Sequence, residues 1–227
     1  MKRRAASIMC KVCSGLVCVL ALSSTVLALS AESTLVSSLD NKDADRSETS
    51  VGNLIADAYM AATGADLALV SAGDLKPSSQ SIVPGKVQSS DLAALLAYPD
   101  DRIVVLALDG RKVREALERS VANYPRPGLG FLQVAGCKLT FDPSRPAGDR
   151  ITSIAVAGKP LLSEQAYKVA MPNSLANGAL GYWKVWSQRN VISKASDAVS
   201  CTAAVDRYFL ANQKLDYSIL NRVTAAK

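Results

Sequence analysis

The segment from Pro172 to Trp186, PNSLANGALGYWKVW, has the residue types of a loop that approaches a ligand closely. Its asparagines and glycines follow a strand-like run and favour tight turns, and aromatic residues come directly after them. The segment contains no carboxylate, no arginine and no histidine. The chemistry of this loop therefore depends on which of its remaining groups could bind a ligand.

The absence of histidine from the 227 residues limits the catalytic chemistry that the chain can carry. A Ser-His-Asp triad, a Cys-His pair, an HExxH zinc site and the usual dinuclear phosphoesterase site all need histidine. The sequence also lacks an S-x-x-K pair, a G-x-x-x-x-G-K-[ST] loop and a G-x-G-x-x-G turn after a strand. We therefore expect no catalytic residue, no metal site and no cofactor in this chain.

The formal net charge of +6 is concentrated at the N-terminus. The first 31 residues hold four basic side chains and no acidic one, and the rest of the chain carries about +2. Such a small excess does not indicate a nucleic-acid partner. The basic residues at 2–4, the apolar run GLVCVLALSSTVLAL and the small residues Ser30 and Ala31 are typical of a secretory signal peptide at 1–31.

Cleavage after Ser30 or Ala31 would give an exported protein, periplasmic or extracellular, with no further membrane contact. An uncleaved anchor is the alternative, because residues 12–29 could just span a bilayer at about 1.5 Å per residue. Cys137 and Cys201 remain after cleavage. They could form a disulfide or pack separately as small buried thiols.

Apolar residues recur at helical spacing from Val51 to Ala62 and end at Gly64, which suits a left-handed C-terminal cap. Ser89 and Asp109 each suit the N-cap of a further helix. Trp183 and Trp186 could line a surface groove or pack in the core. Strands are expected at 66–70, 102–108, 131–142, 150–156 and 167–171, and a last helix at about 198–213.

Helices and strands thus alternate first, and mostly strands and a final helix follow. This order predicts an α/β fold, a single layered domain with a mixed β-sheet and packed helices. We expect the domain at 46–215, a flexible entry segment at 32–45 because it is polar and aperiodic, and a C-terminal tail at 216–227.

Five motifs follow one another along the chain: ETSVGNLIADAYM, ADLALVSAGDLKP, ALDGRKVREALE, GFLQVAGCKLTFDPSRPAGDRI and YKVAMPNSLANGALGY. In order and spacing they resemble the C-terminal substrate-recognition domain of 5'-nucleotidases. The resemblance runs from Arg46 to Leu215 and implies stacked α/β layers that follow a separate metallophosphoesterase domain. That domain has no counterpart in this sequence.

The resemblance also locates a nucleoside pocket whose residues have changed. The family's N-G-G-x-x-R loop, whose Asn and Arg hold substrate, is matched by Ser71, Gly73 and Lys76. An amide becomes a hydroxyl, and a planar bidentate guanidinium becomes a point charge. The aromatic residue of F-L-Q-V that stacks on the base is retained as Phe131.

The family's N-F-L-x-x-G-G-D-G-Y motif is matched around Asn177, with changes at two substrate-binding positions. The second stacking ring is replaced by Ser174, and the aspartate that binds the ribose hydroxyls is replaced by Leu180. A base stack contributes about 1 to 3 kcal/mol and a hydrogen bond to a charged group about 1.5 to 3 kcal/mol. Losing both would weaken nucleoside binding by roughly 2.5 to 6 kcal/mol if the losses add.

Two functions are consistent with this degraded pocket. The first is an exported domain, non-catalytic by itself, that binds another small ligand or a protein partner. The second is the substrate-recognition component of a nucleotidase-type hydrolase, working with a separate metallophosphoesterase chain. A weakly bound nucleoside-like molecule is an expected ligand in either case.

Overall fold

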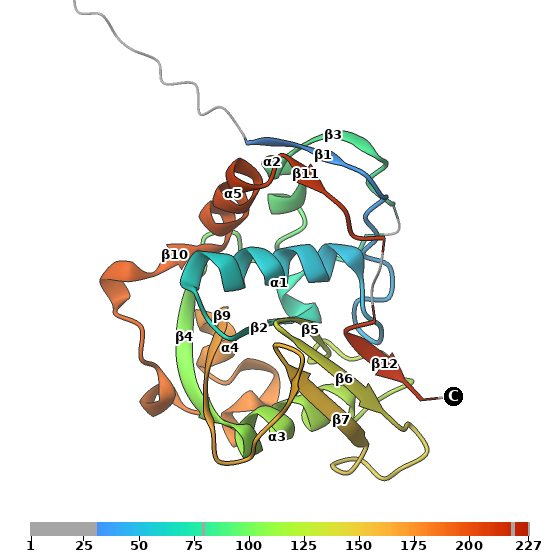
Figure 1. The fold of residues 1–227 in the computed structure, drawn as a ribbon, viewed down its shortest axis with the longest axis vertical. Helices are drawn as coiled ribbons and strands as arrows, with labels where there is room; N and C mark the ends of the chain where they lie inside the picture. The colour runs from blue at the N-terminus through green and yellow to red at the C-terminus, as the bar shows by residue number, and fades with distance from the viewer. Residues whose placement is uncertain (1–30, 79, 219–220, 227) are drawn as a thin grey trace, which may run out of the picture.

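The computed structural model describes residues 31–226 except 79, 219 and 220, and Figure 1 shows their arrangement. The predicted signal segment lies outside the described residues, apart from Ala31. Among the described residues, no helix is both long enough and apolar enough to cross a bilayer. The α-helices are α1 (Ser50–Thr63), α2 (Ser89–Ala93), α3 (Gly110–Val121), α4 (Asn173–Ala176) and α5 (Cys201–Ala211).

The strands of the described residues form three sheets, so the predicted α/β class is confirmed but the β-structure is divided. The central sheet has the order β10 (Val199–Ser200), β4 (Arg102–Asp109), β9 (Ala166–Pro172), β2 (Leu67–Ser71) and β5 (Leu132–Ala135). The second has the order β12 (Val223–Ala225), β6 (Cys137–Phe141), β7 (Ile151–Val156) and β8 (Lys159–Pro160). The third has the order β11 (Lys214–Leu215), β1 (Glu32–Leu35) and β3 (Gly85–Gln88).

The central sheet is covered on both faces, and β2 is buried along its whole length. Leu67 and Leu69 pack in the core that contains the apolar face of α3. Ala68 and Val70 pack in the core that contains α1 and α5. This alternation follows from the period of two along a strand, and it places α1 and α3 on opposite sides of the sheet (Figure 1).

The ends of α1 and α3 confirm the capping predictions. The hydroxyl of Thr49 accepts a hydrogen bond from the N–H of Gly52, and Gly64 ends α1 with φ at +62°. The carboxylate of Asp109 accepts from the N–H of Lys112 at the start of α3. The prediction for Ser89 is wrong by one residue, because Gln88 is the N-cap of α2 and Ser89 its first helical residue.

The expectation of a flexible entry segment at 32–45 is corrected by β1. This strand pairs antiparallel with β3 and parallel with β11, and Leu35 is buried. Leu39 is also buried and forms an isolated bridge with Ile82. The partners of this segment lie far away along the chain, so its local polarity did not reveal the pairing.

The C-terminal tail predicted at 216–227 also packs on the domain. Its strand β12 extends the second sheet by pairing parallel with β6. Arg222 forms a two-pronged ion pair with Asp57 of α1, with N···O distances of 2.7 and 2.8 Å. Glu48 accepts three further hydrogen bonds, from the backbone N–H groups of Asn221, Arg222 and Val223.

The alternatives left open for the cysteines and tryptophans are decided by burial. Cys137 and Cys201 are buried free thiols, and burial raises the pKa of each to about 12. Trp186 is 2% exposed and packs in the core, whereas Trp183 is 66% exposed. The two tryptophans therefore do not form one groove.

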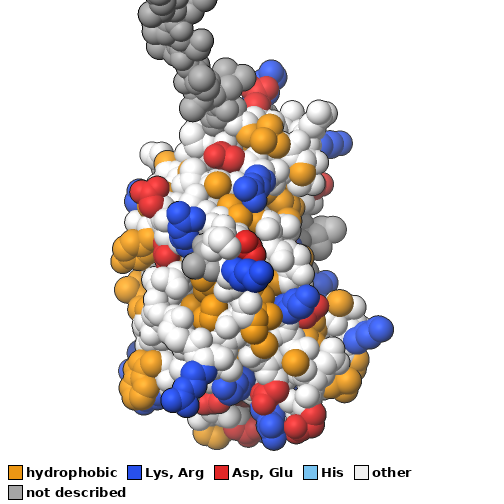
Figure 2. Space-filling view, turned by 90° about the vertical axis from the view of Figure 1, so that its left-hand side faces the viewer, with side chains coloured by type: hydrophobic (Ala, Val, Ile, Leu, Met, Phe, Trp, Pro, Cys, Tyr) orange, Lys and Arg blue, Asp and Glu red, His pale blue; other side chains and the backbone are white. Residues whose placement is uncertain are grey.

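Acidic and basic side chains are interspersed over the face that Figure 2 shows. Hydrophobic side chains are scattered between them. This face therefore has no continuous basic surface of the kind that contacts a phosphate backbone.

Candidate functional site

The loop after β2 begins at Ser71, where the resemblance implies a substrate-binding amide. Ser71 is buried, and its hydroxyl donates a hydrogen bond of 2.7 Å to Oδ2 of Asp74. The backbone N–H of Ser71 donates to the same oxygen at 2.9 Å. Burial raises the pKa of Asp74, and the bonds from Ser71 partly oppose that shift. The Ser71 side chain is thus engaged within the chain.

Gly73, two residues further on, lies where three loops meet. Its N–H donates to the carbonyl of Leu129 at 2.9 Å. A Cβ at Gly73 would lie 3.2 Å from Cδ1 of Leu180 and 3.6 Å from Cβ of Leu129. The loops after β2, after α3 and after β9 are therefore in close contact at this point.

Two cavities flank this contact. The first, which we call the Phe131 cavity, has a volume of about 270 Å³. Its walls combine aromatic and aliphatic side chains with two guanidinium groups and one carboxylate. The residues that matter for its chemistry are Asp45, Arg119, Arg126, Leu129, Phe131 and Leu180.

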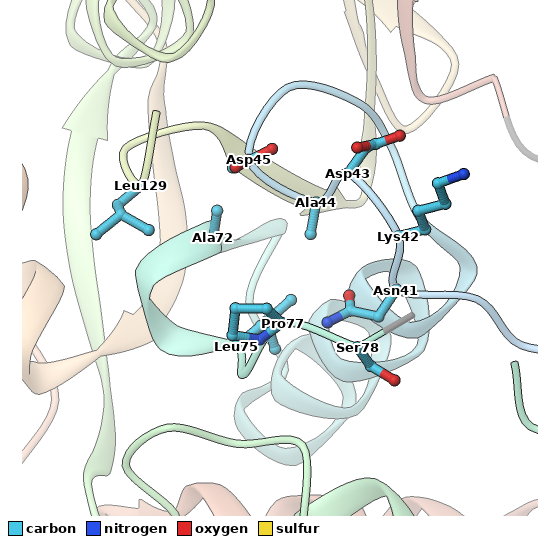
Figure 3. A pocket seen from close by; sticks show the side chains of 10 residues that line it. All are labelled: Asn41, Lys42, Asp43, Ala44, Asp45, Ala72, Leu75, Pro77, Ser78 and Leu129. Carbon is cyan, nitrogen blue, oxygen red and sulfur yellow. The ribbon is translucent and has the colours of Figure 1, made fainter. Parts of the chain in front are cut away.

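The second cavity, the Ala72 cavity, has a volume of about 420 Å³ and shares Asp45 and Leu129 with the first. Figure 3 shows Ala44 and Ala72 pointing into it from opposite sides, while Lys42 points away. Its inner surface is therefore largely apolar, with charged groups at the rim. The two cavities adjoin each other at Asp45 and Leu129, and we refer to them together as the hollow around Leu129.

Leu180 has a backbone conformation that is unusual for its residue type. Its φ is +57° and its ψ is +22°, in the left-handed region, and its side chain is 38% exposed. Aspartate, asparagine and glycine adopt this conformation more readily than a leucine does. The carbonyl of Leu180 accepts a hydrogen bond of 2.5 Å from the guanidinium of Arg119. The position thus retains a backbone suited to the family's aspartate without its carboxylate.

Ser174 does not lie across from Phe131 as a stacking group. Its N–H donates to the carboxylate of Asp101 at 2.9 Å, and its hydroxyl is buried. Ser174 lines a separate cavity of about 450 Å³, together with Tyr98. Phe131 is itself 4% exposed. A second ring that could enclose a base is therefore absent at the predicted position.

Lys76 and Asn177 point to neighbours outside the two cavities. The ammonium of Lys76 donates to the carbonyl of Ala94 at 3.0 Å. The side-chain oxygen of Asn177 accepts from the amide of Gln188. No group of three or more Cys, Asp or Glu side chains in the described part of the chain is arranged to hold a metal ion.

The structure thus brings together only part of the predicted site. Phe131 and Leu180 line the Phe131 cavity, and Gly73 packs beside Leu180. The other four predicted residues lie elsewhere or are engaged within the chain: Ser71, Ser174, Lys76 and Asn177. Sequence reasoning missed the arginines of this cavity. Their signal was a basic residue in the last turn of α3 and another in the NYPRPGLG loop that follows it.

Comparison with known proteins gives a consistent result. The family model for the 5'-nucleotidase C-terminal domain matches residues 24–188. Human 5'-nucleotidase is 29% identical over 153 residues, and the snake venom 5'-nucleotidase of Gloydius brevicauda is 30% identical over 155 residues. Each alignment covers 60% of this chain and 26% of the relative, so the chain spans about a quarter of the length of these relatives.

Among solved structures, a 5'-nucleotidase precursor from Thermus thermophilus superposes with a TM-score of 0.76 at 26% sequence identity. The superposition covers 87% of this chain and 40% of the Thermus chain. The NAD nucleotidase of Haemophilus influenzae shares the fold with a TM-score of 0.67 at 17% identity, over 86% of this chain and 38% of that chain. The fold similarity therefore extends over most of the described residues.

Proposed function

Because the chain belongs to the 5'-nucleotidase C-terminal domain family, we propose that it is an exported ligand-binding domain that does not hydrolyse phosphate esters by itself. Its ligand occupies the hollow around Leu129, and nucleosides bind there only weakly. The export is supported by the signal-like sequence at 1–31.

The observation that carries this proposal is the state of Leu180. The residue keeps a left-handed backbone and lines the Phe131 cavity, but its side chain offers no acceptor for sugar hydroxyls. Ser174 removes the second ring, and Ser71 is committed to Asp74. The scaffold is retained while the groups that recognise a nucleoside are not.

The proposed lack of hydrolysis is supported by the composition of the chain. The sequence contains no histidine, which the usual dinuclear phosphoesterase sites require. The matched relatives are named 5'-nucleotidases, and about three quarters of their length lies outside the match. The second candidate function is action together with a separately encoded metallophosphoesterase chain. Such a chain would supply the part of the 5'-nucleotidases that lies outside the match.

The test is calorimetry with adenosine on the wild type and on the variant Leu180→Asp. We expect little or no binding by the wild type, because one stack and one charged hydrogen bond are missing. The variant should gain up to about 1.5 to 3 kcal/mol, the contribution of the restored hydrogen bond to a charged group. Leu180→Asn is the matched control, since it keeps the shape but lacks the charge.

Two results would contradict the proposal. Tight adenosine binding by the wild type would mean that the substitutions have not disabled the pocket. Metal-dependent turnover of AMP that stays with the wild-type protein through purification would mean that the chain is catalytic by itself. Stimulation of a metallophosphoesterase chain by the purified domain would instead favour the second candidate.

A further inference from the structure

The Phe131 cavity contains two positive charges that the family resemblance does not account for. Arg119 lies in the last turn of α3, and Arg126 lies in the loop between α3 and β5. Both line the cavity, and neither takes part in an ion pair among the described residues. Asp45 lines the same cavity, but it does not form a salt bridge with either arginine.

Arg119 is held in place while part of its hydrogen-bonding capacity remains unused. One terminal nitrogen donates to the carbonyl of Leu180, and the guanidinium lies 5.4 Å from the centre of the Tyr182 ring. Its Nε is buried and has no hydrogen-bond partner within the described part of the chain. The guanidinium is thus oriented by its neighbours and not neutralised by a carboxylate, which is the arrangement of a preorganised anion receptor.

Arg126 complements this fixed group with an exposed one. Arg126 is exposed and lines the cavity, so it can approach a ligand without giving up an ion pair with another described residue. Leu129, Leu180 and Phe131 add an apolar wall beside the two charges. Guanidinium groups match the planar geometry of carboxylates and the oxygens of phosphates.

We propose that the Phe131 cavity binds a small organic anion, whose carboxylate or phosphate group lies between Arg119 and Arg126. The short apolar part of this ligand contacts Leu129 and Leu180. The inference rests on the proposed function and names the ligand class for the same hollow. It agrees with the proposed weak binding of a neutral nucleoside, since adenosine carries no anionic group to pair with either arginine.

The experiment uses four probes and three proteins in calorimetry at low ionic strength. Phenyl phosphate and benzoate carry the two anionic groups, benzamide is the neutral isostere of benzoate, and inorganic phosphate lacks the apolar part. The proteins are the wild type, Arg126→Gln and Arg207→Gln. Arg207 is a matched control, because it is an exposed arginine on α5, at the other end of the molecule from α3 (Figure 1).

The wild type should bind phenyl phosphate or benzoate, and bind benzamide and inorganic phosphate at least tenfold more weakly. Arg126→Gln should weaken binding of the anion about 10- to 100-fold, as expected for a lost hydrogen bond to a charged group. Arg207→Gln should leave it within about twofold. The stronger of the two anionic probes identifies whether the natural ligand carries a phosphate or a carboxylate.

The proposal fails if the wild type binds neither anion at millimolar concentration, or if both arginine variants weaken binding equally, which would show unspecific charge attraction. Benzamide that binds as tightly as benzoate would also overturn it. These failures leave the proposed function standing, because a neutral ligand could still occupy the hollow. Tight adenosine binding by the wild type would contradict the proposed function instead.

Discussion

The left-handed backbone of Leu180 should be measurable as strain. A residue with a Cβ in this conformation costs roughly 1 to 2 kcal/mol more than in the right-handed region, and glycine does not have this cost. At ordinary positions the preference is reversed, since glycine is about 0.5 to 1 kcal/mol less favourable than alanine. The sign of the alanine–glycine difference therefore reports the strain at Leu180 directly.

We compare Leu180→Ala with Leu180→Gly, because both remove the same apolar contacts and differ only in Cβ. The glycine variant should be more stable than the alanine variant by about 0 to 1.5 kcal/mol, the strain less the entropic cost of glycine. For a chain of this size, 1 kcal/mol corresponds to a Tm difference of about 2 to 4 °C. Urea unfolding and a thermal scan measure both quantities.

Leu129 supplies the matched control for this comparison. It is an exposed leucine that lies close to Leu180, and its φ is not in the left-handed region. At Leu129 the alanine variant should be the more stable one by about 0.5 to 1 kcal/mol. The difference between the two sites then equals the strain of roughly 1 to 2 kcal/mol. An alanine–glycine difference of the same sign and size at both sites would refute the reasoning.

Two further predictions concern charges inside the domain. Burial raises the pKa of Asp74, so the folded state holds this proton more tightly than the unfolded state does. The stability of the wild type relative to Asp74→Asn should therefore fall as pH rises above the ordinary aspartate pKa. Urea unfolding of both proteins at several pH values tests this, and a stability difference that does not change with pH would contradict it. Arg222→Met should lower the free energy of unfolding in urea by about 3 kcal/mol or more, because it leaves the partly buried Asp57 without its ion-pair partner. Lys86→Met, at an exposed ion pair, is the control and should lower it by less than about 1 kcal/mol. Equal losses would contradict a structural role for β12.

Sequence patterns predicted the ends of helices well where one residue type determines the backbone conformation or the capping hydrogen bond. Gly64 at the end of α1 and Asp109 at the start of α3 are positions where backbone conformation and capping chemistry follow from the residue itself. Strands β1 and β12 were missed because their stability comes from partners distant in sequence. The polar segment before α1 acquires its structure from β3 and β11, which no local pattern encodes.

The candidate site shows the same division. The motif comparison placed Phe131 and Leu180 at one cavity, because it compared whole loops and not isolated residues. It could not predict the hydrogen bond from the Ser71 hydroxyl to Asp74. The comparison shows that a serine replaces the family's asparagine, but it does not show which neighbour the new hydroxyl contacts. Nor could it identify Arg119 as part of the cavity, because the matched motifs end at Glu118 and resume only at Gly130.

The loop at 172–186 keeps those motif positions that hold the fold together. Gly178 and Gly181 both have positive φ, and a Cβ at Gly181 would meet the guanidinium of Arg119 at 1.9 Å. The Tyr182 hydroxyl donates to the carbonyl of Gly130 at 2.7 Å, and its ring stacks on Trp186 at 4.8 Å.

These contacts attach the loop to the segment that carries Phe131, whether or not a nucleoside is bound. Ser174 and Leu180, by contrast, can change with little effect on that attachment, because their side chains face cavities. The family's loop can therefore persist in sequence and shape after its nucleoside contacts are lost. The arginine beside Gly181 then remains available for a ligand of different chemistry.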